Sequence, residues 1–223
     1  MKKMLASIAI LAFLLAGCGS ADKQSAASNP PPAKQESMTD LFAKGKNLPG
    51  ITYDYTVKMM QGPGLSGKMW VAGKKMKTET VVEKQKIVTY VDGEANAVYS
   101  YLPEQRMLMK TPYDPAKADK SPDQYAKETD ASKVKILETV VYDGAKCKVV
   151  VLEGEKQQQT KLWVREDYGI PAKVEVTADG AVFMTAEYKN ITVAPVPPET
   201  FALPKGVPIT DMSEMMKDIP KKP

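Results

Sequence analysis

The chain has 223 residues, 43% of them hydrophobic and 26% charged, with a formal net charge of +4 and no histidine. The lack of histidine removes the usual general base, the common serine and cysteine triads and the commonest metal ligand. The 31 basic residues include only two arginines, Arg106 and Arg165, and are interspersed with Asp and Glu. We therefore expect neither nucleic-acid binding nor an arginine cluster for phosphate.

The first 17 residues have the pattern of an export signal. Lys2 and Lys3 precede an apolar run of about a dozen residues, which is shorter than the ~20 that a membrane-spanning helix needs. The segment that follows, Leu15-Ala16-Gly17-Cys18, resembles a bacterial lipobox. This resemblance implies that residues 1–17 are cleaved and that Cys18 carries a covalent diacylglyceryl group, with or without an N-acyl chain. The alternative is an ordinary secretory signal that ends on a cysteine by chance.

Residues 18–37 are rich in Ala, Ser, Lys, Gln and Pro and have no apolar periodicity, which is typical of a flexible tether after the lipidated Cys18. A short helix is predicted next, capped by Thr39 and running to about Lys46. Leu41 and Phe42 would supply its apolar contacts.

From Ile51 onward the pattern changes to a period of two, which predicts strands with one buried face. Asp143-Gly144 and Asp179-Gly180 are the clearest hairpin turns. A polar break over 111–132, with a helical piece after Ser121, is long for a connection in a compact domain. In all, eleven strands are predicted, at 51–59, 68–72, 76–82, 86–91, 97–102, 106–110, 134–142, 146–153, 160–165, 172–177 and 181–193.

Two pairs of segments in these strands repeat each other. Lys68-Met69-Trp70-Val71 leads through a turn to Lys77, and Lys161-Leu162-Trp163-Val164 leads to Lys173. Either an old duplication or two independent hairpins that each need a large residue on a pleated surface explains this.

Cys147 would be the only free thiol once Cys18 is acylated, so no intramolecular disulfide is expected. It alternates in phase with Val149 and Val151, which favours a small buried hydrophobe over a reactive thiol. Asp123, Glu128 and Asp130 cluster in the polar break and are interpreted as solvated turn charges. The spacings contain no phosphate loop or metal-ligand pattern. Enzyme activity, a metal and a non-covalent cofactor are therefore not expected.

The order of these parts resembles the lipoprotein-carrier superfamily, which has the LolA/LolB-like fold. The resemblance runs from Met38 to Met212 and leaves 213–223 as a C-terminal tail. Its closest match is the outer-membrane-lipoprotein-sorting-like branch. The features that carry it are the two Lys-x-Trp-Val segments, Gly169-Ile170-Pro171, Tyr188-Lys189-Asn190-Ile191 and the ending Phe201-Ala202-Leu203-Pro204. It implies a mainly β fold, a curved unclosed antiparallel barrel of about eleven strands, with a few short helices covering the concave side.

In such proteins the concave side holds acyl chains or another hydrophobic ligand. Methionines on predicted strands are compatible with an adaptable apolar cavity, although a sheet core packed on its own helix explains them equally well. The residues we assign to the cavity are Tyr53, Tyr55, Val57, Met69, Met76, Met107, Leu162, Val174 and Met184.

The functional hypothesis is a monomeric lipoprotein, anchored on the outer side of the cytoplasmic membrane or on an outer membrane. It would bind lipid or a lipidated protein, in a carrier or sorting role. The alternative is an envelope sensor or protein-interaction module on the same fold.

Overall fold

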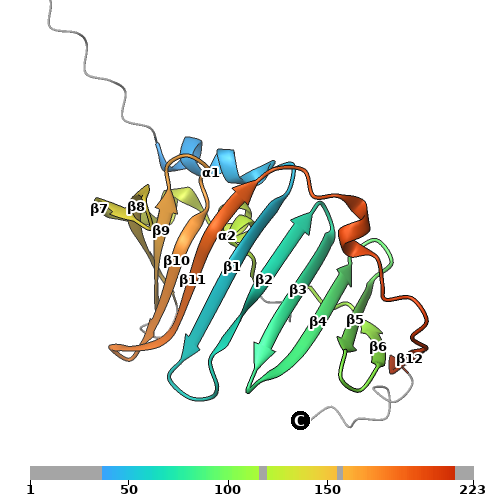
Figure 1. The fold of residues 1–223 in the computed structure, drawn as a ribbon. Helices are drawn as coiled ribbons and strands as arrows, with labels where there is room; N and C mark the ends of the chain where they lie inside the picture. The colour runs from blue at the N-terminus through green and yellow to red at the C-terminus, as the bar shows by residue number, and fades with distance from the viewer. Residues whose placement is uncertain (1–36, 116–119, 155–157, 214–223) are drawn as a thin grey trace, which may run out of the picture. The chain divides into compact units, whose positions relative to one another are not determined.

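The described residues fold around one twisted sheet, seen in a computed structural model (Figure 1). The structure describes residues 37–115, 120–154 and 158–213, which all fall within one compact unit. The predicted signal, Cys18 and the tether up to residue 36 lie outside the described residues, as does the tail from residue 214.

Twelve strands and two α-helices are present in the described residues. The strands are β1 (Ile51–Met59), β2 (Leu65–Ala72), β3 (Lys75–Val82), β4 (Gln85–Asp92), β5 (Ala97–Leu102), β6 (Met107–Pro112), β7 (Val134–Tyr142), β8 (Ala145–Glu153), β9 (Gln159–Arg165), β10 (Pro171–Ala178), β11 (Ala181–Val193) and β12 (Ile209–Asp211). The helices are α1 (Met38–Lys46) and α2 (Pro122–Glu128), with short 3₁₀ turns at Ala131–Lys133 and Pro198–Phe201.

The strands form one sheet in the order β12-β6-β5-β4-β3-β2-β1-β11-β10-β9-β8-β7. Every neighbouring pair is antiparallel except β12 with β6. The two edges, β12 and β7, do not pair with each other, so the barrel stays open. This confirms the predicted mainly β, curved and unclosed antiparallel architecture with a few short helices on the concave side.

The sequence prediction missed one strand, β12. It has only three residues, all exposed, and pairs in parallel with β6 from Leu108 to Lys110. A segment of three residues is too short to show the alternation of apolar and polar residues that predicts a strand, so the sequence pattern could not identify it. The eleven predicted strands are all present, and the two Asp-Gly turns have positive φ at both positions, as a type I′ hairpin requires.

Helix α1 begins earlier than expected, and its N-cap is Ser37 rather than Thr39. The hydroxyl of Ser37 accepts a hydrogen bond from the backbone N–H of Asp40 at 3.1 Å. Leu41 and Phe42 are almost fully buried, as predicted, and pack against strand residues of the core. Burying each such side chain contributes about 1.5–3 kcal/mol, so α1 is held by its apolar face.

Helix α1 packs against the turn between β9 and β10. The ammonium group of Lys44 donates to the backbone carbonyl of Glu166 at 2.6 Å. Gly169 has a φ of +65°, and a Cβ there would collide with the carbonyl oxygen of Leu41. A Cβ on Gly45 would lie 2.8 Å from the carbonyl oxygen of Gly169. Helix and turn therefore meet through backbone, at a distance that only glycine permits.

We expect Gly169→Ala to destabilise the fold more than Gly180→Ala. Both glycines have positive φ, which costs an L-residue about 1–2 kcal/mol, but a Cβ on Gly180 meets nothing within 4 Å. The clash with α1 should add at least about 1–2 kcal/mol at Gly169. Urea unfolding of the two variants measures the difference, and equal midpoints would contradict the close backbone contact.

Candidate hydrophobic binding site

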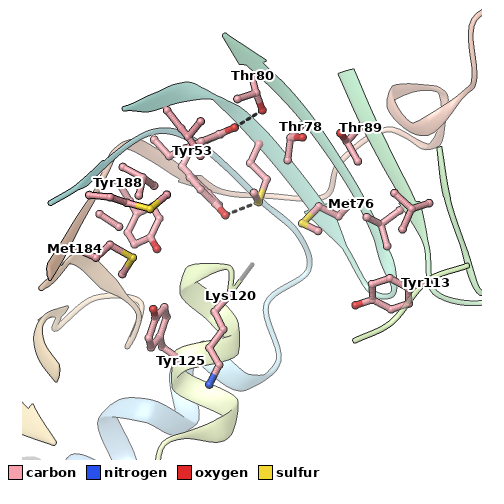
Figure 2. A pocket seen from close by; sticks show the side chains of 18 residues that line it. Tyr53, Met76, Thr78, Thr80, Thr89, Tyr113, Lys120, Tyr125, Met184 and Tyr188 are labelled. Atoms are coloured by element: carbon pink, nitrogen blue, oxygen red, sulfur yellow. Dashed lines mark hydrogen bonds between the residues drawn. The ribbon is translucent and has the colours of Figure 1, made fainter. Parts of the chain in front are cut away.

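A cavity of about 400 Å³ lies between the concave face of the sheet and α2. Its floor is made by residues of β11, β1, β2, β3, β4 and β5, and Tyr113, Lys120 and Tyr125 close the other side (Figure 2). Met59, which lines one end, is 40% exposed, so that end of the cavity reaches the surface.

The strand register explains why these side chains share one face. Along β1, alternate residues point the same way, so Tyr53, Tyr55, Val57 and Met59 all line the cavity. Tyr53 pairs with Met69 of β2, Met69 with Thr78 of β3, and Thr78 with Thr89 of β4. A single row of side chains thus crosses four strands.

Two tyrosines of this floor are held in place by specific contacts. The hydroxyl of Tyr53 donates to the sulfur of Met69 at 2.6 Å, and its ring meets that of Tyr188 edge to face, with the centroids 5.3 Å apart. The hydroxyl of Tyr55 lies 2.5 Å from Oγ1 of Thr80, two strands away (Figure 2). Tyr55 crosses β2 at Gly67, its register partner, where a Cβ would come within 2.9 Å of the tyrosine hydroxyl oxygen.

All nine residues assigned to the cavity from the sequence lie on the concave face, but they do not all meet at the cavity. Its lining includes Tyr53, Tyr55, Val57, Met69, Met76 and Met184.

The other three predicted residues lie elsewhere on this face. Leu162 of β9 and Val174 of β10 are fully buried in the core with Phe42 of α1, because the helices cover this part of the sheet. Met107 begins β6 and is 39% exposed. Alternation assigns a side chain to a face, but it does not tell where along the sheet the helices will lie.

Sequence reasoning missed the polar part of the lining. Thr78 and Thr80 alternate in phase with Met76, and Thr89 faces Thr78 across the register, so the strand pattern could have found all three. Tyr113, Lys120 and Tyr125 come from the break over 111–132, where no such pattern exists. Of the described residues that line the cavity, Lys120 is the only charged one, and its ammonium group lies 2.6 Å from a carboxylate oxygen of Glu128.

The acidic residues of the same break correct one sequence interpretation. Asp123 is buried rather than solvated, and it accepts hydrogen bonds from the hydroxyl of Ser121 at 2.6 Å and from the ammonium group of Lys127 at 2.7 Å. It fixes the first turn of α2, so its role is structural. Glu128 pairs with Lys120 as described, and Asp130 caps the following 3₁₀ turn.

Cys147 is fully buried in β8, as its alternation with Val149 predicted. Burial raises the pKa of its thiol from 9.0 to about 11, because the thiolate would lose its hydration. A thiol in such surroundings is inert. Within the described parts of the chain, no group of three His, Cys, Asp or Glu side chains is placed to hold a metal ion.

The same described residues include no helix that is both long and apolar enough to cross a membrane.

Comparison with solved structures finds a similar fold in other proteins. An uncharacterized conserved protein from Thermus thermophilus superposes with a TM-score of 0.56 and 10% identity, over 78% of this chain and 96% of the other. MucB superposes with a TM-score of 0.52 and 12% identity, over 78% of this chain. The match covers 64% of MucB, so this chain corresponds to less than two thirds of that protein.

MucB is also known in complex with MucA(peri), and that structure superposes with a TM-score of 0.50 and 14% identity, over 75% of this chain and 59% of the other. No family model matches the sequence, and no curated protein matches it. At identities this low the likeness establishes the curved open sheet and carries no information on the residues of the cavity.

We expect Cys147 to resist alkylation at about pH 8 in the folded protein and to react readily in concentrated urea. The raised pKa lowers the thiolate fraction about 100-fold relative to an unperturbed thiol, and burial blocks access as well. Iodoacetamide labelling followed by mass spectrometry measures this, and rapid labelling of the folded chain would contradict the buried assignment.

The same pKa sets a pH dependence of stability. Because the thiol ionises more easily in the unfolded chain, its burial stabilises the fold fully below pH 9, and this contribution is lost as the pH rises toward about 11. Cys147→Ala should remove that part of the decline in alkaline urea titrations.

Proposed function

We propose that this chain is an extracytoplasmic lipoprotein, anchored through acylated Cys18, whose concave-face cavity binds an acyl chain of a lipid or of a lipidated protein. It acts by binding and holding its ligand, without chemistry and without a cofactor. The cavity carries this proposal, because its volume lies within the roughly 300–1,000 Å³ typical of small-molecule sites.

The composition of the lining supports an apolar ligand. Met69, Met76 and Met184 face the cavity together with valines and the rings of Tyr53 and Tyr188. Unbranched thioether side chains adapt to irregular apolar surfaces. Each methylene that an acyl chain buries there contributes about 0.8 kcal/mol, so even a partly inserted chain would be held.

A protein-binding role on the same fold is the second candidate, and one edge of the sheet favours it. Strand β7 has nine residues and, within the part of the chain that the structure describes, pairs with β8 alone. Three apolar side chains on it are well exposed: Ile136 (47%), Leu137 (47%) and Val141 (76%). Such an edge can accept an added strand from a partner. MucB, which shares the fold, has been captured with a partner protein. Crosslinking that recovers a partner even when the cavity is blocked would favour this role.

The anchor is tested by metabolic labelling of the full chain with an alkyne-bearing fatty acid. We expect labelled protein, and loss of the label in Cys18→Ala, because that thiol is the acceptor in the lipobox. Cys147→Ala is the matched control, since Cys147 is buried. It should keep the label, and a label that survives Cys18→Ala would contradict the anchor.

Filling the cavity should abolish ligand binding. A chain that begins at residue 18 with Cys18→Ser lacks acyl chains but keeps the whole compact unit, so uptake of a fluorescent acyl probe can be titrated. Val57→Trp places a large ring in the cavity and should weaken binding by at least about tenfold. Thr56→Trp, on the opposite face of the same strand, should leave affinity within about twofold.

Mass spectrometry of lipid that copurifies with this chain tests the same binding role without an added probe. A protein that is always empty and takes up no probe would refute the binding role.

A further inference from the structure

We infer that the cavity selects an uncharged amphiphile, an acyl chain joined to a neutral head that carries hydroxyl or ester groups, and that Thr78 and Thr89 bind this head. The inference rests on the proposed acyl-binding function and adds the class of ligand and the residues that recognise it. Three observations on the lining carry it: a cluster of hydroxyls, a mostly apolar wall opposite, and the pairing of the one charged side chain among the described lining residues.

The hydroxyl cluster lies on β3 and β4. Thr78 and Thr89 are direct register partners, so their side chains stand next to each other on the cavity face. Among the described residues, neither hydroxyl has a hydrogen-bond partner, whereas that of the nearby Thr80 bonds to Tyr55. Each free hydroxyl offers one donor and two acceptor positions, which suits a glycerol hydroxyl or an ester carbonyl.

The wall on the β1 and β11 side of the cavity is mostly apolar: beside the rings of Tyr53, Tyr55 and Tyr188 it consists of aliphatic and thioether side chains. Val57, Met59, Met184 and Ala186 line it, and their register pairs are Val57 with Ala186 and Met59 with Met184. Figure 2 shows Met184 and Tyr188 on one side of the cavity and the threonines on the other. A ligand with a polar head and an apolar tail therefore has one orientation that satisfies both ends.

The charges at the cavity disfavour a ligand with an anionic head. Lys120 is the one charged side chain among the described lining residues, and its ammonium group already pairs with Glu128 at 2.6 Å. A carboxylate or phosphate placed beside the threonines would lose hydration without gaining a counter-ion, which is strongly unfavourable. A neutral hydroxyl or ester loses much less and is compensated by hydrogen bonds.

The test compares two fluorescent probes that carry the same labelled acyl chain, a monoacylglycerol and the corresponding free fatty acid. Both are titrated into the chain that begins at residue 18 with Cys18→Ser, above about pH 8 so that the acid is ionised. We expect the monoacylglycerol to bind at least about tenfold more tightly. In Thr78→Val/Thr89→Val its affinity should fall about tenfold while that of the fatty acid stays within about twofold.

Two further variants separate hydroxyl recognition from packing. Thr78→Ser/Thr89→Ser keeps both hydroxyls and should retain the preference for the monoacylglycerol. Thr56→Val removes a hydroxyl from the opposite face and should change neither affinity. Circular dichroism checks that the valine variant is folded, and if it is not, the serine pair and the ratio in the unsubstituted chain still decide the question.

The outcomes distinguish this inference from the function on which it rests. If neither probe binds, the acyl-binding function itself fails. If both bind but the fatty acid binds as tightly or more tightly, or if the valine pair leaves the ratio unchanged, the acyl-binding function stands and the neutral-head inference is overturned.

Discussion

The structure depends on a mismatch between one wide sheet and two short helices. In the described residues, twelve strands at a spacing of about 4.8 Å give a sheet roughly 50 Å wide. Helices α1 and α2, with nine and seven residues, are only about 14 and 10 Å long. The helices can bury the concave face over β8–β11 and the neighbouring part of β1, where Phe42 and Leu162 share one core. Further along the sheet the same face is not packed directly against a helix, and the cavity remains there between the strands and α2, whose Tyr125 lines it.

This mismatch also explains what could be predicted from the sequence. The alternation of Ile51, Tyr53 and Tyr55 gave β1 its bounds, and Asp143-Gly144 and Asp179-Gly180 marked two hairpins, because period two and turn chemistry are local properties. The face on which each cavity candidate would lie followed from the same alternation. The position along the sheet did not, since it depends on where α1 docks. That contact is made between the backbones at Leu41 and Gly169, which no residue pattern records.

The repeated Lys-x-Trp-Val segments make the same cross-strand contact in both hairpins. On the face opposite the cavity, Lys77 lies over the ring of Trp70 at 4.8 Å, and it is the register partner of that residue. Lys173 lies over Trp163 at 4.3 Å and is its partner in the same way. Each hairpin thus covers an indole ring with a cross-strand ammonium group, a contact worth about 0.5–1 kcal/mol at an exposed site. Cross-strand pairing of a lysine with a tryptophan is enough to account for the repeated segments, whether or not they arose by duplication.

The residue types in the chain limit how a bound ligand could be released. The chain has no histidine, which is the only side chain whose ordinary pKa lies between pH 5 and 8. Among the described lining residues, the one charged side chain is Lys120, which pairs with Glu128. A change of pH within that range therefore cannot act through a histidine at the cavity. An acyl chain held there would leave through the end of the cavity that reaches the surface at Met59, by transfer to an apolar surface that holds it more tightly. Since only differential affinity can shift such an equilibrium, the direction of transfer is set by the acceptor and not by the compartment.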